Sequence, residues 1–419
     1  MKYVILNHCS HNKGDNSVLF YLTEAIKLND KNFESISISC SDGSLPFWLN
    51  EENVDATYWP GGKIFKNPNV SYFSNAFRRL KFLFMRKFVY KIFIGNFSKG
   101  NYSFCKLIAK NFFGEKLFNS IKTADKVFCT GGHHISNVLE RDCINPQLVS
   151  LVIATILGKK TIFWSQSIGP FEGASEQSKK AIGKIFDSCQ MLYVRDDLSI
   201  NCINEVSNSN NFIKAPDSVF LSNKLIDVKN KNNTRKYICC AVYTAGITDE
   251  KYLTTYRDAW VKISHAAIEL GFDVIFLPMQ YKGYGGDERP FLKKIINIVN
   301  SKKVTYSDMD ESPKDTLELY KNASFIIGHK THSIIYGLAL EVPTIAVAYH
   351  EKTRYFMSMY GFEEYVFDDV VNNEFAIIKL LSEDTIKSQA LTHLHSRHSE
   401  KFANQLISNM RESICINSH

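Results

Sequence analysis

The densest group of reactive side chains follows a short apolar run at residues 325–327. After this predicted strand, a helix begins with Lys330, Thr331 and His332. A cation beside the free N–H groups of a helix start is a strong anion trap, and a neighbouring imidazole transfers protons near neutral pH. These residues therefore predict an anion site with a proton-transfer group next to it.

A second polar group follows the first apolar run of the chain, where Gly14, Asp15 and Asn16 open another predicted helix. Free N–H groups at that helix start favour an anion or an oxygen-rich ligand, and Gly14 allows close approach. An aspartate that caps the helix is the alternative interpretation. The loop has neither the G-x-G-x-x-G nor the Walker pattern, so NAD and ATP binding are not predicted.

Three further predicted strands end in residues that suit ligand binding. Gly131 and Gly132 permit close backbone approach and are followed by His133. Gln166 offers a donor and an acceptor to a sugar hydroxyl. Arg195 at a strand end binds carboxylate or phosphate through two parallel hydrogen bonds, unless a neighbouring aspartate pairs with it instead.

Metal and disulfide chemistry are not predicted. The adjacent histidines at 133 and 134 point in different directions on most backbones, and the other histidines lack a matching set of carboxylates or cysteines. The ten cysteines include no C-x-x-C pair, which indicates reduced, buried thiols. No apolar stretch suits a secretory signal or reaches the ~20 residues of a membrane-spanning helix. We therefore expect a soluble, cytoplasmic protein without a metal or cofactor.

The elements that must position these side chains are short apolar runs alternating with helical stretches, which is typical of parallel α/β sheets. A polar linker at 222–236 separates a Rossmann-like domain at 1–221 from a second one at 237–395, and a helical tail follows at 396–419. The predicted fold is α/β, with two doubly wound domains facing a central cleft and ligands beyond the carboxyl ends of the strands. The predicted strands are 3–6, 126–129, 161–164, 191–194, 237–242, 274–277, 325–327 and 344–348.

Residues 56–114 form a basic and aromatic insertion in the first predicted domain. The insertion has no acidic residue and eleven lysines and arginines, more than the whole chain's net charge of +7. Interleaved rings and ammonium groups suit an anionic bilayer, where each near-surface cation adds about 1 kcal/mol, and the same charge would attract nucleic acid. A helical wheel of residues 77–94 spreads the cations around most of the circumference, so a helical subdomain with solvated lysines is the alternative.

The order and spacing of these motifs resemble those of the polysaccharide pyruvyl transferase family. Members are similar in architecture to two-domain GT-B glycosyltransferases, and they transfer the enolpyruvyl carbons of phosphoenolpyruvate onto two hydroxyls of one sugar as a ketal. The residues that carry the resemblance are Gly14-Asp15-Asn16, Thr130-Gly131-Gly132, Gln166-Ser167-Ile168-Gly169-Pro170, Val194-Arg195-Asp196-Asp197-Leu198-Ser199, Ala215-Pro216-Asp217, Lys330-Thr331-His332, Gly337, Pro343, Tyr349 and Lys352.

The resemblance implies a donor site in the second domain and an acceptor site in the first. The family's R-x-H motif falls on Lys330-Thr331-His332, where lysine keeps the charge but loses the bidentate fork. Together with Arg195, the Lys330 side chain and the Thr331 N–H are expected to bind phosphoenolpyruvate. His332 is the expected acid for its methylene carbon.

The same resemblance leaves the base and part of the acceptor site open. Asp15, His133 and Asp217 are the candidates for accepting the hydroxyl protons. The sequence Gly131-Gly132-His133 departs from the family's three-glycine version, which bears on acceptor binding.

The expected partners are phosphoenolpyruvate and a sugar acceptor, but not nucleic acid. Surface polysaccharide units are assembled in the cytoplasm on a polyprenyl diphosphate lipid, so the resemblance also implies a peripheral position on the inner face of the plasma membrane. Two alternatives stay open. One is a nucleotide-sugar glycosyltransferase, with Glu341 or Glu351 on the ribose; the other is a non-catalytic anion- or glycan-binding protein, which the lysine at 330 would fit.

Overall fold

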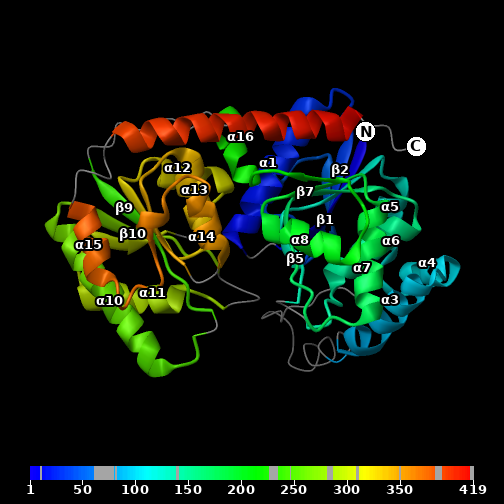
Figure 1. The fold of residues 1–419 in the computed structure, drawn as a ribbon, viewed down its shortest axis with the longest axis horizontal. Helices are drawn as coiled ribbons and strands as arrows, with labels where there is room; N and C mark the ends of the chain where they lie inside the picture. Colours follow the sequence, from blue (N-terminus) through cyan, green and yellow to red (C-terminus); the bar gives the residue numbers. More distant parts are fainter. Residues whose placement is uncertain are drawn as a thin grey trace. The chain divides into compact units, whose positions relative to one another are not determined.

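The chain is α/β and divides into two compact units, each built on one parallel sheet (Figure 1). The first unit comprises Met1–Ser10, Val18–Ser218 and Gln405–His419, and the second comprises His11–Ser17 and Val219–Asn404. Parts of the predicted linker and of the basic insertion lie outside the described residues. The computed structural model describes residues 1–9, 12–60, 80, 83–137, 141–225, 235–245, 247–280, 286–307, 311–348, 351–382 and 389–415.

The sheet of the first unit has the strand order β3-β2-β1-β4-β6-β7-β8, and β5 pairs with β6. The four predicted runs are confirmed as β1, β4, β6 and β7, whereas the other four strands were not predicted. The core lies between this sheet and its helices. The strands are β1 (Lys2–His8), β2 (Ser35–Cys40), β3 (Val54–Tyr58), β4 (Lys126–Cys129), β5 (Gly132–Ile135), β6 (Thr161–Ile168), β7 (Met191–Val194) and β8 (Phe212–Lys214).

Helix α6 (Pro146–Ile156) shows how the sequence sets these boundaries. The Asn145 side chain accepts a hydrogen bond from the Leu148 N–H, and Pro146 occupies the first turn. The helix packs against β1, β6 and the helices around it, so it is apolar on nearly all sides. The other helices of this unit are α3 (Tyr90–Lys99), α4 (Tyr102–Phe112), α5 (Glu115–Thr123), α7 (Glu176–Ser188) and α8 (Asp197–Val206), with short η1 (Phe47–Leu49), η2 (Met85–Val89) and η3 (Ser218–Leu221).

The second sheet has the strand order β11-β10-β9-β12-β13-β14, with every pair parallel. The four predicted runs are confirmed as β9, β10, β12 and β13, and β11 and β14 were not predicted. The strands are β9 (Tyr237–Ala241), β10 (Asp273–Phe276), β11 (Val304–Tyr306), β12 (Phe325–Gly328), β13 (Thr344–Val347) and β14 (Val366–Phe367).

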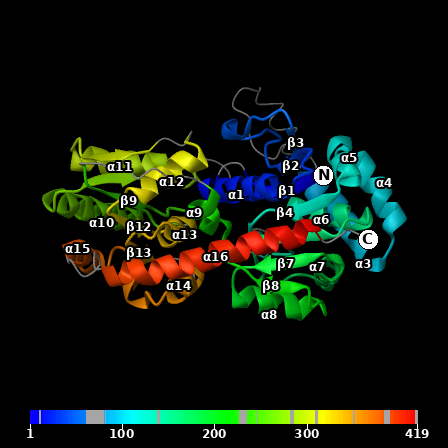
Figure 2. The same cartoon turned by 90° about the horizontal axis from the view of Figure 1, so that it is seen from above.

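Helices on both faces enclose the core of this second sheet (Figure 2). Ser312 caps the start of α12 through a capping box with Asp315. Two long helices contribute to both units: α1 (Lys13–Asn29), whose first turn belongs to the second unit, and α16 (Gln389–Cys415). The remaining helices are α9 (Ser222–Leu225), α10 (Glu250–Glu269), α11 (Arg289–Val299), α12 (Pro313–Lys321), α13 (Thr331–Leu340), α14 (Glu351–Ser358) and α15 (Glu374–Ser382), with η4 (Glu363–Tyr365).

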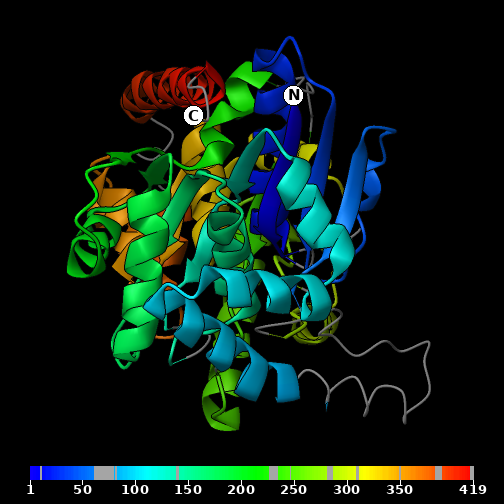
Figure 3. The ribbon, with the colours of Figure 1, turned by 90° about the vertical axis from the view of Figure 1, so that its right-hand side faces the viewer.

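The described part of the basic insertion is mainly helical. It begins within strand β3, then continues through η2, α3 and α4, which pack beside α6 and α7 of the first unit (Figure 3). Among the residues described, no helix combines the length and the apolar character that crossing a bilayer requires.

Candidate functional site

The second sheet places its polar residues at a topological switch point. Strands β9 and β12 are neighbours at the centre of the sheet, and the strand order runs outward in opposite directions from them. Ligands of doubly wound sheets bind in the crevice beyond the carboxyl ends of such strands. Tyr243 follows β9, and Lys330 follows β12 as the N-cap of α13. The predicted anion site therefore lies where this fold class binds ligands.

Lys330 is held on three sides by residues of the same unit. Its Nζ lies 3.0 Å from Glu288 Oε1, 3.3 Å from Gln280 Oε1 and 4.8 Å from the centre of the Tyr243 ring. The side chain of Lys330 is 10% exposed and that of Glu288 is fully buried. The Glu288 carboxylate forms an ion pair with this ammonium group, and the Gln280 oxygen accepts a hydrogen bond from it. These contacts fix the position of the Lys330 cation.

Glu288 is a site residue that sequence analysis missed. Its carboxylate also accepts hydrogen bonds from the backbone N–H groups of Met279, at 2.8 Å, and Gln280, at 3.3 Å. Burial raises the pKa of Glu288, and the Lys330 charge and these hydrogen bonds oppose that rise. Its position just before Pro290 in a post-strand segment was the available signal, but it lies 42 residues from Lys330 in the sequence.

The first turn of α1 lies against the start of α13, as the pairing of Gly14 with His332 shows. A β-carbon at position 14 would overlap the imidazole of His332. The Gly14 N–H is capped by Asn12 Oδ1 at 2.8 Å, and Ser17 shares a hydrogen bond with the Tyr336 hydroxyl of α13. The structure thus brings together two predicted site segments that are more than 300 residues apart in the sequence.

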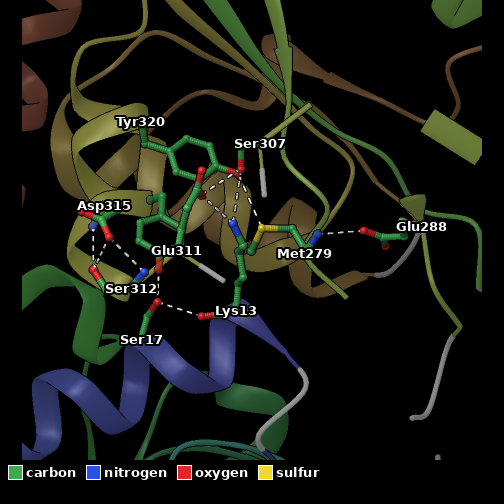
Figure 4. A network of polar contacts seen from close by, with 10 residues as sticks. Lys13, Ser17, Met279, Glu288, Ser307, Glu311, Ser312, Asp315 and Tyr320 are labelled. Carbon is green, nitrogen blue, oxygen red and sulfur yellow. Dashed lines mark hydrogen bonds and ion pairs between the residues drawn. The ribbon is translucent and has the colours of Figure 1, made fainter. Parts of the chain in front are cut away.

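Lys13 anchors this first turn from the other side (Figure 4). Its Nζ makes a partly buried ion pair with Glu311 at 2.8 Å and lies 3.4 Å from the Ser307 hydroxyl. Its backbone N–H donates to the Met279 carbonyl at 3.0 Å, next to the N–H that binds Glu288. Lys13 was not predicted as a site residue. These contacts hold the turn that contains Gly14 in place.

His329 and His332 have different environments although both open the helix segment. His329 Nδ1 lies 2.7 Å from the Tyr256 hydroxyl, which in turn accepts a hydrogen bond from the Tyr243 N–H. Burial and the adjacent Lys330 charge lower the pKa of His329 to about 3. His329 is therefore neutral near pH 7 and has a structural role. His332, in the first turn of α13, is then the candidate imidazole for contact with a ligand.

In the first unit, Arg195 belongs to a buried network. It pairs with Asp217 and donates to the Gly132 carbonyl, at 3.2 Å, and to the Ser167 hydroxyl, at 3.1 Å. The alternative of a pair with Asp196 or Asp197 is wrong, because Asp196 caps α8 and Asp197 pairs with Lys214. Within the described chain, Arg195 Nε has no hydrogen-bond partner. The guanidinium is thus oriented from within its own unit, and its Nε–H is among the donors that these three hydrogen bonds do not use.

Gln166 lies inside β6 rather than in the turn that sequence analysis predicted. The strand continues through Ile168 because its polar side chains are paired: Gln166 Nε2 donates to the Thr130 carbonyl, and Ser167 donates to Asp196 at 2.8 Å. Gln166 is fully buried, and its Oε1 has no hydrogen-bond partner among the described residues. One amide acceptor therefore remains unsatisfied at this edge of the first sheet.

The predicted glycine loop is also partly a strand, because Gly132 and His133 begin β5. Gly132 has a φ of 141°, and any β-carbon there would overlap His134. His133 Nε2 donates to the Gly169 carbonyl. His134 is buried, and burial lowers its pKa to about 4. A β-carbon at Gly131 would overlap Val18, so this glycine serves close packing.

The remaining predicted residues divide between the two units. Asp15, Asn16 and Thr331 lie in the second unit with Lys330 and His332. The Asn16 Oδ1 is buried and lacks a hydrogen-bond partner in the part of the chain that is described. The side chain of Lys352, like Tyr349, lies outside the described part. Among the described residues, no group of three or more histidine, cysteine, aspartate or glutamate side chains is arranged to hold a metal ion.

Acid sensitivity follows from His134 and His329, whose pKa values are lowered by burial. In the unfolded chain their pKa is near 6.5, so below that pH the unfolded state takes up protons that the folded state excludes. Stability is therefore highest above pH 6.5 and falls as the pH drops toward 4, by roughly 2 kcal/mol per histidine at pH 5. Urea unfolding at pH 7 and pH 5 measures this difference, with His134→Gln reporting on the first unit and His329→Gln on the second.

The exposed His265 of α10 provides the control for this experiment. We expect each buried-histidine variant to lose its share of the pH dependence and His265→Gln to retain all of it. Equal pH dependence in wild type and both variants would show that the buried histidines are not the cause.

Solved structures with the same fold come from nucleotide-sugar enzymes. The chain is similar to the putative UDP-N-acetylglucosamine 2-epimerase from Listeria monocytogenes, with a TM-score of 0.58, 8% identity and coverage of 99% of this chain and 96% of that one. The S. aureus MnaA–UDP structure matches with a TM-score of 0.59 and 11% identity, over 98% of this chain and 94% of that one. Anabaena Alr3699/HepE in complex with UDP-glucose matches with a TM-score of 0.56 and 10% identity, over 99% of both chains. At these identities the likeness shows the fold alone, two Rossmann-like domains of the GT-B type.

The sequence itself points to one family. Among curated proteins, no sequence matches the chain significantly. The family model described as polysaccharide pyruvyl transferase matches residues 47–351, well over half of the chain. The match includes Arg195 and Lys330-Thr331-His332, whereas Gly14-Asp15-Asn16 and Lys352 lie outside it. The chain belongs to the polysaccharide pyruvyl transferase family.

Proposed function

We propose that the protein transfers the pyruvyl group of phosphoenolpyruvate onto two hydroxyls of one sugar, as a ketal, during cell-surface polysaccharide biosynthesis. The observation that carries this proposal is the start of α13. In a member of this family, a fixed cation, a helix N-terminus and an imidazole lie together at the switch point of the second sheet. This combination suits a small, highly charged anion that must also receive a proton.

In this proposal the second unit binds the donor. The Lys330 ammonium group and the Thr331 N–H, at the positive end of the α13 dipole, receive the phosphate or carboxylate of phosphoenolpyruvate. Glu288 and Gln280 act as positioning residues that hold Lys330 toward the ligand. Arg195 contributes through its Nε–H, because Asp217 and its other partners already engage the terminal nitrogens.

The chemistry needs one acid and one base. His332 gives a proton to the methylene carbon, C2 becomes electrophilic, and the first sugar hydroxyl oxygen bonds to it. The C2–O bond to phosphate then breaks, phosphate leaves, and the second hydroxyl closes the ketal. One hydroxyl proton replaces the proton lost by His332 and the other leaves with phosphate, so the enzyme is restored.

Asp15 is the base that the contacts favour. It lies in the same turn as Gly14, which packs against the His332 ring. The other two candidates lie in the first unit, where Asp217 pairs with Arg195 and His133 donates to the Gly169 carbonyl. We assign the acceptor to the first unit, where Gly131, Gly132 and Gln166 surround Arg195, and we propose a lipid-linked glycan as its source.

Ligand-dependent thermal stabilisation tests the donor assignment. A ligand at 100 times its Kd adds about 2.7 kcal/mol, which shifts the melting temperature measurably. We expect stabilisation by phosphoenolpyruvate that Lys330→Ala abolishes and Lys330→Arg, which restores the family's arginine, retains. The exposed Lys302 provides the control, because Lys302→Ala should leave the shift unchanged.

Other outcomes would redirect the assignment. Stabilisation by a uridine-diphosphate sugar and not by phosphoenolpyruvate would replace pyruvyl transfer with glycosyl transfer. Stabilisation by phosphoenolpyruvate without phosphate release in the presence of any acceptor glycan would indicate a binding protein.

A further inference from the structure

The outer face of the α3–α4 helical pair exposes large apolar side chains in a regular row. Phe84, Phe88 and Ile92 follow one another at intervals of four residues and are 54%, 49% and 51% exposed. The rings of Phe84 and Phe88 lie 5.5 Å apart. The chain passes from the π-helical turn η2 into α3 here, and the three exposed side chains follow one another along these two elements as an apolar row.

The opposite side of the same helix is already fixed in the core. Tyr90, Phe93, Ile94 and Phe97 are fully buried against the first unit, where α3 packs on α6 and α7. The exposed row is therefore not needed to fill the core of the first unit. The helical wheel of residues 77–94 did not separate these two faces, because it spread the cations around most of the circumference.

Helix α4 extends the apolar face. Half of the exposed large apolar side chains in the described part of the chain come from this one short region, and such clustering marks an interaction surface. We call these nine residues the α3–α4 face. They are Leu80, Leu83, Phe84, Phe88, Ile92, Tyr102, Phe104, Leu107 and Phe112.

The charge of this region is of one sign. Lys91 and Lys99 on α3 and Lys106 and Lys110 on α4 are exposed. No acidic residue occurs anywhere between Asp55 and Glu115 in the sequence. An aqueous protein surface of this size ordinarily carries both signs. Apolar rings whose charged neighbours are all lysines fit a surface with an anionic outer layer and an apolar interior.

We propose that the α3–α4 face docks the protein on the surface of an anionic lipid bilayer. The rings enter the boundary between headgroups and acyl chains, and the lysines reach the lipid phosphates. The attachment is peripheral. It is independent of the donor proposed above, so its failure would leave pyruvyl transfer untouched.

Sedimentation with vesicles tests the proposal on the full-length protein. We expect binding to vesicles of 70% phosphatidylcholine and 30% phosphatidylglycerol and at least tenfold weaker binding to pure phosphatidylcholine. Phe84→Ser/Phe88→Ser and Lys91→Glu/Lys99→Glu should each weaken binding to the anionic vesicles at least tenfold, with unchanged melting temperature and unchanged phosphoenolpyruvate binding.

Matched variants separate this face from general effects of charge and hydrophobicity. Phe375→Ser removes a ring that is more exposed than either target, and Lys31→Glu/Lys160→Glu reverses the same number of charges on the first unit outside α3, α4 and the helices they contact. Both should bind like the wild type. Equal binding by all variants, or by both vesicle types, would overturn the proposal. So would binding to a single-stranded oligonucleotide but not to vesicles, which would assign the face to nucleic acid.

Discussion

Replacing His332 with alanine should lower the rate of pyruvyl transfer by about 10²–10⁴-fold, the usual contribution of a positioned general acid. The reason is that His332 is the imidazole at the ligand edge, whereas His329 is buried and bound to Tyr256. Lys330 keeps its partners in the variant, so phosphoenolpyruvate should still stabilise the protein. The measurement is phosphate release with saturating donor and acceptor.

The isotope content of the product gives the sharper readout. In deuterated water, the acid delivers solvent deuterium to the new methyl group, so the wild type should form it at the rate of turnover. A His332→Ala enzyme with full turnover and normal deuterium incorporation would show that another group is the acid. Loss of phosphoenolpyruvate binding in this variant would instead make His332 a ligand of the donor.

Gly14→Ala should lower turnover by about 10²-fold, because displacing a reacting group by about 1 Å has effects of this size. The added methyl overlaps the imidazole of His332, and Lys13 prevents the turn from moving away. Alanine is a better helix former than glycine by about 1 kcal/mol, which offsets part of the about 1–3 kcal/mol that such an overlap costs, so the variant should remain folded. Turnover and thermal unfolding, measured on one preparation, check both expectations.

Two companions make this substitution interpretable. Gly95→Ala adds the same methyl to helix α3, where it meets only the end of the Gln177 side chain at 3.3 Å, and should leave turnover unchanged. Gly14→Ala/His332→Ala should be no slower than His332→Ala, since no ring is left to displace. Additive losses in the double variant would mean that Gly14 acts on the ligand directly.

The sequence was sufficient to predict the central strands of both sheets. Runs such as 237–242 and 325–327 are continuously apolar because helices cover both faces of a parallel sheet. The outer strands escaped prediction because they are short or alternate with polar residues. Ser35–Cys40, for example, reads S-I-S-I-S-C, and β8 has three residues of which two are exposed.

Only those residues of the candidate site could be predicted whose place at the junction of a strand and a helix can be read from the sequence. Lys330, Thr331 and His332 follow a buried strand and open a helix, which a sequence displays directly. Glu288 could not be found in this way, because its importance lies in a contact with Lys330 that only the folded sheet creates. Gln166 was misplaced for a related reason: hydrogen bonds to neighbouring strands keep a polar segment within a sheet, and the pattern of apolar residues does not record them.

The shared helix α1 has a consequence for how the protein can be divided. Its first turn supplies Lys13 and Gly14 to the second unit, while Val18 and the residues after it belong to the first. A fragment that begins near Val219 would lack Lys13, which pairs with Glu311, and Gly14, which packs against His332. The two units are therefore not exchangeable modules. A chimera that takes its second unit from a relative must take residues 11–17 from that relative as well.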